Sequence, residues 1–490
     1  MTEKQQSHRK LRRRLKNAAS YDEWQNLADE LDRRLALDAW RANRESSEYH
    51  HELLQFHIDR LREHREAGAY QDIVDLLYQA LYRHLGDITA RALYDVAHGG
   101  TKNIIDTFLR ESELALRALC DEGASGLSNE DKLTRFEVAA QNFGRSALLL
   151  SGGATLGFYH LGVARALWSQ GLLPRVISGS SMGAIIAAAI CCRTDQELGD
   201  WFPYPERIDA KGLGLASFRA IIARRALLDQ ERLLENVRHS CGDYTFAEAY
   251  ARTGRVLNIT VSPTRSRQKP RLLNYRTAPD VLISHACIAS SAVPGLFPPV
   301  TLRRRNADGG TSPYMPTETW VDGSIQNDLP KRRLSRLQNV NHFIVSQTNP
   351  HVLPFARATD GSGLVSKAVA VGTRVVRSQG SHALDIVRHV GIATPFGPLL
   401  DAAHSMVGQD YGGDIDIHPR FDAKLYRKMF SNAGPEELGR FVLEGERATW
   451  PRMAMVRNQT AIGRSLESCI AHLRQKSGRR ANDRTGRAPR

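Results

Sequence analysis

SALLLSGGATLGFYHLGVARALWSQGLLPRVISGSSMGAII, residues 146–186, runs twice through the same order: a short apolar run, a glycine-containing turn and a longer apolar segment. The short runs at 146–150 and 174–178 predict buried strands, and the longer segments predict helices. Strands and helices that alternate at this pace indicate a βαβ unit, whose parallel sheet is covered by helices on both faces. The sequence therefore predicts an α/β fold with a mostly parallel sheet.

Helical segments are expected on both sides of this α/β region. Apolar residues recur at helical spacing from Tyr21 to about residue 142, where proline is absent, and the helical pattern returns beyond about residue 360. Further strands are predicted at 255–262, 317–321 and 342–347. The predicted division is a flexible basic N-terminus (1–20), a helical domain (21–143), an α/β domain (144–350), a C-terminal helical extension (351–475) and a flexible basic tail (476–490).

Composition limits the class of protein. The chain has 490 residues, of which 42% are hydrophobic, so it is globular and long enough for two or three domains. Its net charge of +14 is partly concentrated at the two ends. Such basic ends are ordinarily solvated, and they also attract anionic partners such as a membrane surface or nucleic acid.

Cysteine usage and hydropathy bear on location. The six cysteines show no C-x-x-C pair, which favours a reduced, cytosolic setting. The basic N-terminal stretch is not followed by an apolar core, so we expect no secretory signal. The longest apolar run, 184–192, falls short of the roughly 20 residues that cross a bilayer. Contact with lipid is therefore expected from the surface.

The turn GSSMG, residues 179–183, places Ser181 between Gly179 and Gly183, where a predicted strand meets a predicted helix. A G-x-S-x-G turn of this kind can expose a serine nucleophile. Small residues also fill many strand-to-helix turns for steric reasons alone. The assignment of Ser181 as a nucleophile therefore depends on its partners.

The earlier turn, SGGATLG (151–157), admits three interpretations. A dinucleotide site requires glycine where Ala154 stands and an acidic residue after the second strand, and neither is present. A phosphate-binding P-loop requires G-K-[ST], which does not follow. An oxyanion hole remains, in which the N–H groups of Gly152 and Gly153 face a developing negative charge. Bulk added at Gly153 is then expected to fill the position of the carbonyl oxygen.

Spacing connects the two turns. Gly152 and Ser181 are 181 − 152 = 29 residues apart, about one βα crossover, so both turns lie at the same edge of a parallel sheet. An α/β-hydrolase would take its oxyanion loop from a more distant strand and would need a late histidine. Downstream, Asp322-Gly323 directly follows an apolar strand and offers a carboxylate base. A carboxylate with a pKa near 3.9 is a poor base at neutral pH unless its surroundings raise that value.

Together the motifs resemble a known family. SGGATLG, GSSMG, ASSAVPGLFPPV (289–300) and VDGSIQNDLP (321–330) resemble, in order and separation, the patatin-like lipases and phospholipases. The segments at 20–32, 98–109, 346–355 and 410–419 are similar to the subgroup of intracellular triacylglycerol lipases, which carries a helical domain before the catalytic one. The resemblance covers roughly residues 20–470.

The resemblance implies a role for each matching residue. Ser181 would be the nucleophile and Asp322 the general base, with Gly152, Gly153 and Ala154 forming the oxyanion hole; Gly179, Gly183 and Gly323 would support the turns. No histidine would complete a triad, which leaves His160 a packing residue. The chain departs from the commoner pattern at Leu156, where many members have arginine, and at Ser324, where many have glycine or alanine.

The expected function is hydrolysis of acyl esters of lipids, with triacylglycerol-type substrates first, through a Ser–Asp dyad and an acyl-enzyme, without metal or cofactor. A phospholipase or lysophospholipase, an acyl transferase and a non-catalytic lipid-surface protein are the alternatives. We expect a cytoplasmic protein that associates peripherally with a membrane or lipid-droplet surface. Nucleic-acid binding is not expected, since the basic ends lack interleaved aromatics. The oligomeric state is left open.

Overall fold

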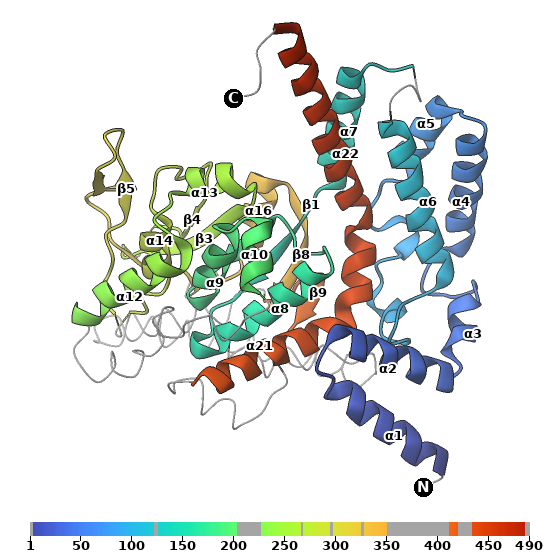
Figure 1. The fold of residues 1–490 in the computed structure, drawn as a ribbon, viewed down its shortest axis with the longest axis horizontal. Helices are drawn as coiled ribbons and strands as arrows, with labels where there is room; N and C mark the ends of the chain where they lie inside the picture. Colours follow the sequence, from blue (N-terminus) through green and yellow to red (C-terminus); the bar gives the residue numbers. More distant parts are fainter. Residues whose placement is uncertain are drawn as a thin grey trace, which may run out of the picture. The chain divides into compact units, whose positions relative to one another are not determined.

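The computed structural model describes residues 3–121, 126–202, 227–265, 268–294, 297–324, 328–349, 411–419 and 434–485 (Figure 1). The chain forms two compact units. The first combines residues 1–146 with residues 450–490, and the second comprises residues 147–449.

The first unit is helical. Its helices are α1 (Glu3–Lys16), α2 (Tyr21–Arg34), α3 (Leu37–Ala42), α4 (His51–Glu66), α5 (Tyr70–Ala80), α6 (Asn103–Cys120), α7 (Asn129–Phe143) and α22 (Met453–Thr485). Helix α22 packs along α6 and α7, and α4 packs against both α5 and α6. Leu466 and Leu473, two turns apart on α22, are almost fully buried. The last helix of the chain thus supplies part of the core of the N-terminal unit.

The N-terminal residues differ from the expectation of a flexible segment, because residues 3–16 form helix α1. Leu11 and Leu15 stand one turn apart and are buried, so they give the segment an apolar stripe, and α1 packs against α2. Arg12, Arg13 and Arg14 remain exposed. The many charges of this segment are typical of a solvated end and obscure its apolar stripe in the sequence.

The C-terminal region also divides differently from the predicted ranges. Helix α21 (Pro435–Thr449) belongs to the second unit, whereas α22 belongs to the first and continues to Thr485, through most of the tail that was expected to be flexible. The sequence at 363–380 also predicts an amphipathic segment with Lys367, Arg374 and Arg377 on one side, but this stretch and most of the predicted extension lie outside the described residues. Ile415–Ile417, in the region expected to be helical, forms strand β9, because its alternating isoleucines pair with a neighbouring strand.

The second unit is built on one sheet. Its strands are β1 (Arg145–Leu150), β2 (Val176–Gly179), β3 (Val256–Pro263), β4 (Arg271–Leu273), β7 (Trp320–Asp322), β8 (Val340–Ser346) and β9. Their order is β4-β3-β2-β1-β8-β9, with β7 paired to β3. The pairs β1–β2, β2–β3 and β8–β9 are parallel, which confirms the predicted fold class. Strands β5 (Arg303–Arg305) and β6 (Thr311–Pro313) form a separate two-stranded sheet.

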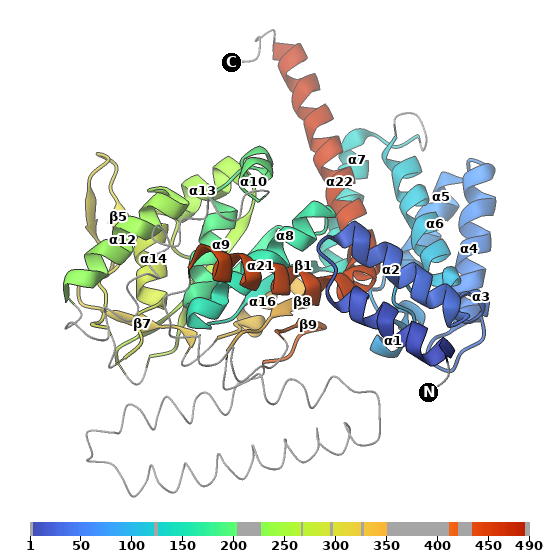
Figure 2. The same ribbon diagram turned by 60° about the horizontal axis from the view of Figure 1, so that its bottom comes forward.

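Helices cover both faces of the sheet (Figures 1 and 2). The helices of this unit are α8 (Phe158–Ser169), α9 (Met182–Cys191), α10 (Asp195–Trp201), α12 (Leu227–Cys241), α13 (Phe246–Thr253), α14 (Ile283–Ser290), α16 (Lys331–Gln338) and α21. Of these, α9, α13, α14 and α16 pack on the strands, whereas α12 packs on α9 and α14, and α21 packs on α8. Ala147 and Leu149 of β1 share a core cluster with Leu334 of α16. The alternate residues Leu148 and Leu150 point to the opposite face and are also fully buried. Burial on both faces explains the continuous apolar runs in the central strands.

Two glycines bring α8 and α21 into backbone contact. A Cβ atom on Gly162 would lie 1.8 Å from the carbonyl oxygen of Val442, and one on Gly445 would lie 2.1 Å from that of Tyr159. Only glycine permits so close a crossing. This contact explains why α21, far along the chain, belongs to the α/β unit.

Strand β7 pairs with the part of β3 that extends beyond the end of β2. Strand β2 ends at Gly179, opposite Ile259, whereas β3 continues to Pro263. Val261 pairs with β4 on one side and with Asp322 of β7 on the other, both antiparallel. Asp322 therefore lies just beyond the end of β2, where the chain turns toward α9.

Candidate active site

Ser181 lies on a strained turn between β2 and α9. Its backbone has φ 54° and ψ −125°, a conformation that residues other than glycine rarely adopt. A Cβ atom on Gly179 would lie 2.2 Å from the Gly183 carbonyl oxygen, and one on Gly183 would lie 2.3 Å from that of Leu150. Both flanking glycines are therefore required by close backbone packing, as expected for an exposed nucleophile turn.

Ser290, on α14, holds this turn. The Ser181 N–H donates to the Ser290 Oγ at 3.0 Å, and the Ser290 hydroxyl donates to the carbonyl oxygen of Thr260 at 2.8 Å. Ser290 is completely buried. It therefore ties the strained backbone of Ser181 to strand β3, a role that its motif did not reveal.

Asp322 lies beside Ser181. Its carboxyl is buried and accepts a hydrogen bond from the Ser324 N–H at 2.8 Å on Oδ1, and the side chains of Ser181 and Ser324 lie close enough to lower its pKa. Burial raises the pKa of Asp322 to about 6, although these polar neighbours act in the opposite direction. Gly323 permits this position, since a Cβ atom there would lie 2.2 Å from the Thr260 carbonyl oxygen.

This pair can perform general base chemistry. At neutral pH a carboxyl with a pKa of about 6 is mostly ionised, yet it binds a proton far more readily than an ordinary aspartate. The raised pKa of Asp322 is thus what an aspartate needs in order to act as a base near neutral pH without a histidine. Ser324, one of the two departures from the family pattern, contacts the Asp322 carboxyl directly. The other, Leu156, is buried.

The glycine turn, residues 151–157, also lies beside Ser181. A Cβ atom built on Gly152 would lie 3.5 Å from the Cβ of Ser181 and 3.5 Å from that of Ser324. The Gly152 N–H donates to Asp328 Oδ1 at 3.0 Å, so it is already occupied. Within the described part of the chain, no acceptor is bound to the N–H of Gly153, Ala154 or Met182. These three are the candidate donors to an oxyanion, and the role of the turn stays a prediction.

Asp328 is a buried carboxyl that the sequence argument missed. Besides Gly152, it accepts from Asn349 Nδ2 at 2.6 Å on Oδ2, and its carbonyl oxygen accepts from the Ser180 hydroxyl at 2.8 Å. Burial, together with the nearby charge of Asp322, raises its pKa to about 7. Asp328 thus joins the glycine turn, the serine turn and the loop after β8. The only signal was a charged residue directly before Leu329-Pro330 and a helix.

His160 supports the glycine turn from within the core. Its Nε2–H donates to the Ser151 carbonyl oxygen at 2.9 Å, which leaves Nδ1 to accept from the Ser346 hydroxyl at 2.7 Å. Burial lowers its pKa to about 4, so the ring is neutral near pH 7. Thr348 completes the support, since its hydroxyl donates to the Gly152 carbonyl oxygen at 3.1 Å. The histidine is a packing residue of the turn, as expected.

The geometry corrects the expected effect of bulk at the glycine turn. A Cβ atom on Gly153 would lie 2.1 Å from Thr348 Oγ1 and would therefore point into the core. The position that faces Ser181 is Gly152. We expect Gly152→Ala to fold normally and to lower ester kcat/KM about 100-fold, comparable to the loss of one oxyanion donor.

Gly153→Ala is the matched comparison, because the same added methyl must displace Thr348. It should lower the melting temperature as well as the activity. Thermal unfolding and ester hydrolysis, measured on both variants, test the distinction. Full activity of Gly152→Ala would show that substrate does not approach this side of Ser181.

Comparisons with known proteins follow the same division of the chain. A family model described as patatin-like phospholipase matches residues 148–333, which contain both turns and the Asp322 motif. A second model, described as a domain of unknown function (DUF3336), matches residues 1–141. The helical segment and the α/β segment are thus matched by separate models.

Curated relatives match along nearly the whole chain. Triacylglycerol lipase ptl3 of Schizosaccharomyces pombe is 34% identical over 483 residues, which cover 96% of this chain and 99% of the relative. Triacylglycerol lipase 4 of Saccharomyces cerevisiae and triacylglycerol lipase SDP1L of Arabidopsis thaliana are each 33% identical over 94% of this chain, and the matches cover 52% and 58% of those relatives. The chain thus spans almost all of one relative and little more than half of two others. These matches confirm the resemblance in the motifs: the chain belongs to the patatin-like phospholipase family.

Proposed function

We propose that this chain is a serine esterase that hydrolyses acyl ester bonds of lipids through Ser181 and Asp322. The observation that carries the proposal is the position of the Ser181 side chain beside a buried carboxyl, Asp322, whose pKa burial raises to about 6. A strained turn with glycine on both sides supports it. Family membership supports lipid esters as the substrate class.

The proposed reaction has two halves. Ser181 Oγ attacks the ester carbonyl carbon while its proton passes to Asp322, and the N–H groups of Gly153, Ala154 and Met182 face the resulting oxyanion. The tetrahedral intermediate collapses to an acyl-enzyme, and the alcohol leaves with the proton from Asp322. Water, deprotonated by the same carboxylate, then releases the fatty acid and restores Ser181.

Triacylglycerol is the first proposed substrate, because several relatives bear that name. A phospholipid substrate is the second candidate, favoured by the description of the family model. Acyl transfer is a third, since the acyl-enzyme can pass its acyl group to an alcohol instead of water. Ser181 and Asp322 have the same roles in all three.

The test combines an active-site label with a substrate panel. The purified chain is treated with a fluorophosphonate probe, and the labelled peptide is identified by mass spectrometry. Hydrolysis of triolein, dioleoylphosphatidylcholine and oleoyl-lysophosphatidylcholine is then followed by released oleate. Labelling at Ser181 with preference for triolein supports the proposal. An unlabelled, inactive chain would favour the non-catalytic lipid-surface protein instead.

We further propose that the chain works in the cytoplasm and reaches lipid, as a membrane or droplet surface, through helix α1. Among the described residues, no helix combines the length and hydropathy needed to cross a bilayer. On α1, basic side chains are exposed while Leu11 and Leu15 are buried, so attraction should be electrostatic rather than by insertion. Each basic residue near an anionic surface contributes about 1 kcal/mol at low salt.

Vesicle flotation tests this surface. Replacing Arg9, Arg12, Arg13 and Lys16 with glutamine should weaken binding to phosphatidylserine-containing vesicles at least tenfold and remove most of its salt dependence. A matched control replaces four exposed arginines elsewhere, Arg44, Arg60, Arg110 and Arg304, with the same loss of charge. Equal losses in the two variants would show that net charge, not α1, governs binding.

A further inference from the structure

The first unit contains an apolar cleft between α5, α6, α7 and α22. Its walls include Leu77, Leu116, Leu119, Phe136 and Leu466. The space between these side chains is about 480 Å³, part of which is open to solvent. This cleft is built entirely from the helical unit and does not involve Ser181 or Asp322.

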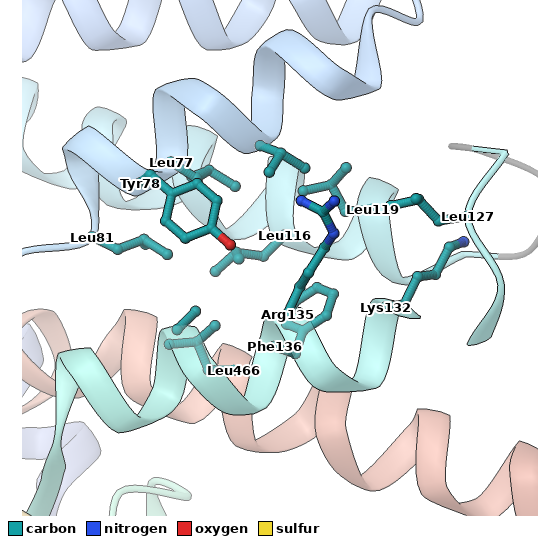
Figure 3. Close-up of a pocket in the computed structure, with 12 residues that line it drawn as sticks. Leu77, Tyr78, Leu81, Leu116, Leu119, Leu127, Lys132, Arg135, Phe136 and Leu466 are labelled. Atoms are coloured by element: carbon teal, nitrogen blue, oxygen red, sulfur yellow. The ribbon is translucent and has the colours of Figure 1, made fainter. Parts of the chain in front are cut away.

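The charged side chains described in the lining of the cleft are all positive. Among the described residues, the lining includes Lys132, Arg135 and the phenol of Tyr78, and no acidic side chain. In Figure 3 the Arg135 side chain extends across the cleft from α7, between Tyr78 and Leu119. Positive charge thus stands directly beside apolar walls.

These cations are not neutralised by neighbouring carboxylates. Lys132 is buried, and its ammonium donates to the carbonyl oxygen of Asp121 at 2.6 Å. Arg135 is half-buried. Among the residues that the structure describes, neither lies within ion-pair distance of a carboxylate. Buried cations are costly unless an anion pairs with them, which makes an anionic ligand favourable here.

We propose that this cleft binds a fatty acid, with its alkyl chain between the leucines and its carboxylate on Arg135 and Lys132. An alkyl chain removes apolar surface from water along the walls. The guanidinium of Arg135 offers a carboxylate two parallel N–H donors, and Lys132 adds a second charge nearby. A neutral lipid of the same length would leave both cations unpaired.

This assignment gives the helical unit a ligand that the proposed reaction releases, although the binding itself does not require that reaction. If the chain proves to have no esterase activity, the cleft would still bind fatty acid. Conversely, an active esterase whose cleft binds nothing would overturn only this inference.

The test measures displacement of a fluorescent fatty acid, cis-parinarate, from the full chain carrying Ser181→Ala. Oleate should displace the probe, whereas monoolein, with the same acyl chain, should do so at least tenfold more weakly. Arg135→Gln should weaken oleate binding about tenfold or more, and Arg135→Glu should weaken it further. Leu119→Trp fills the cleft and should remove the binding.

Arg110→Gln, which removes an exposed arginine outside the cleft lining, is the matched control and should bind oleate as the parent does. Circular dichroism and thermal melting establish that each variant is folded; if Leu119→Trp is not, the Arg135 variants decide. Unchanged oleate binding in folded Arg135→Gln and Arg135→Glu would overturn the proposal. So would equal binding of monoolein, or tighter binding of oleoyl lysophosphatidate than of oleate.

Discussion

Ser181→Ala should lower the turnover of a lipid ester by a factor of about 10⁴ or more and abolish fluorophosphonate labelling, since covalent catalysis ends with the loss of its nucleophile. The fold should be unaffected. Ser181 is on a turn whose strained backbone is held by Ser290 through the main-chain N–H, and alanine keeps that N–H. Circular dichroism and the melting temperature should therefore match those of the parent.

Ser180→Ala is the matched control, because the two serines are adjacent and only one is predicted to react. Ser180 donates its hydroxyl to the Asp328 carbonyl oxygen and is completely buried. Its loss should weaken the turn slightly while labelling of Ser181 continues. If Ser181→Ala turned over ester at the parental rate, or if Ser180→Ala lost the label instead, Ser181 would not be the nucleophile.

Asp322→Asn should be nearly as damaging, with a loss of about 10³- to 10⁴-fold in kcat/KM. Asparagine preserves the size of the side chain and can still accept from the Ser324 N–H, but it cannot take the proton of Ser181. In the parent, kcat/KM should rise with pH, tenfold per unit below the Asp322 pKa of about 6, and level off above it. The sign follows from the role of the group, which acts as a base only when it is ionised.

Two buried neighbours serve as controls for this pH dependence. Asp328→Asn keeps an acceptor for the Gly152 N–H, and His160→Ala removes a ring that burial keeps neutral near pH 7. Both should retain substantial activity and an acidic limb near pH 6. Loss of that limb in Asp328→Asn, with the limb intact in Asp322→Asn, would make Asp328 the base. An inactive, folded His160→Ala variant beside an active Asp322→Asn would mean that the mechanism uses a histidine.

The sequence was most informative where local chemistry requires particular residues. Gly179, Ser181 and Gly183 could be located because a serine on a strained turn needs glycine on both sides, and Asp322 because it directly follows an apolar strand. The five predicted strands are present. These features depend on residues that are close together along the chain, so they can be recognised in a single sequence.

What the sequence did not reveal depends on contacts between distant segments. Ser290 and Asp328 act through hydrogen bonds to residues 109 and 176 positions away, and no local pattern distinguishes them from ordinary polar residues. The direction of a Cβ atom at Gly153, toward Thr348, is likewise a property of the tertiary structure. Helix α1 was missed for a different reason, since its many charges outweighed two buried leucines in the compositional argument.

The insertion of β7 beside β3 has a consequence for how the enzyme acquires activity as it folds. The glycine turn, β2 and the serine turn lie within about one βα unit of chain, whereas Asp322 follows Ser181 by 322 − 181 = 141 residues. Closing so long a loop carries a large entropic cost, and non-local strand pairing is slow. After dilution from denaturant, helical signal should therefore recover before hydrolysis does. The proposed nucleophile would exist for a time without its proposed base, in a chain that is largely folded and still inactive.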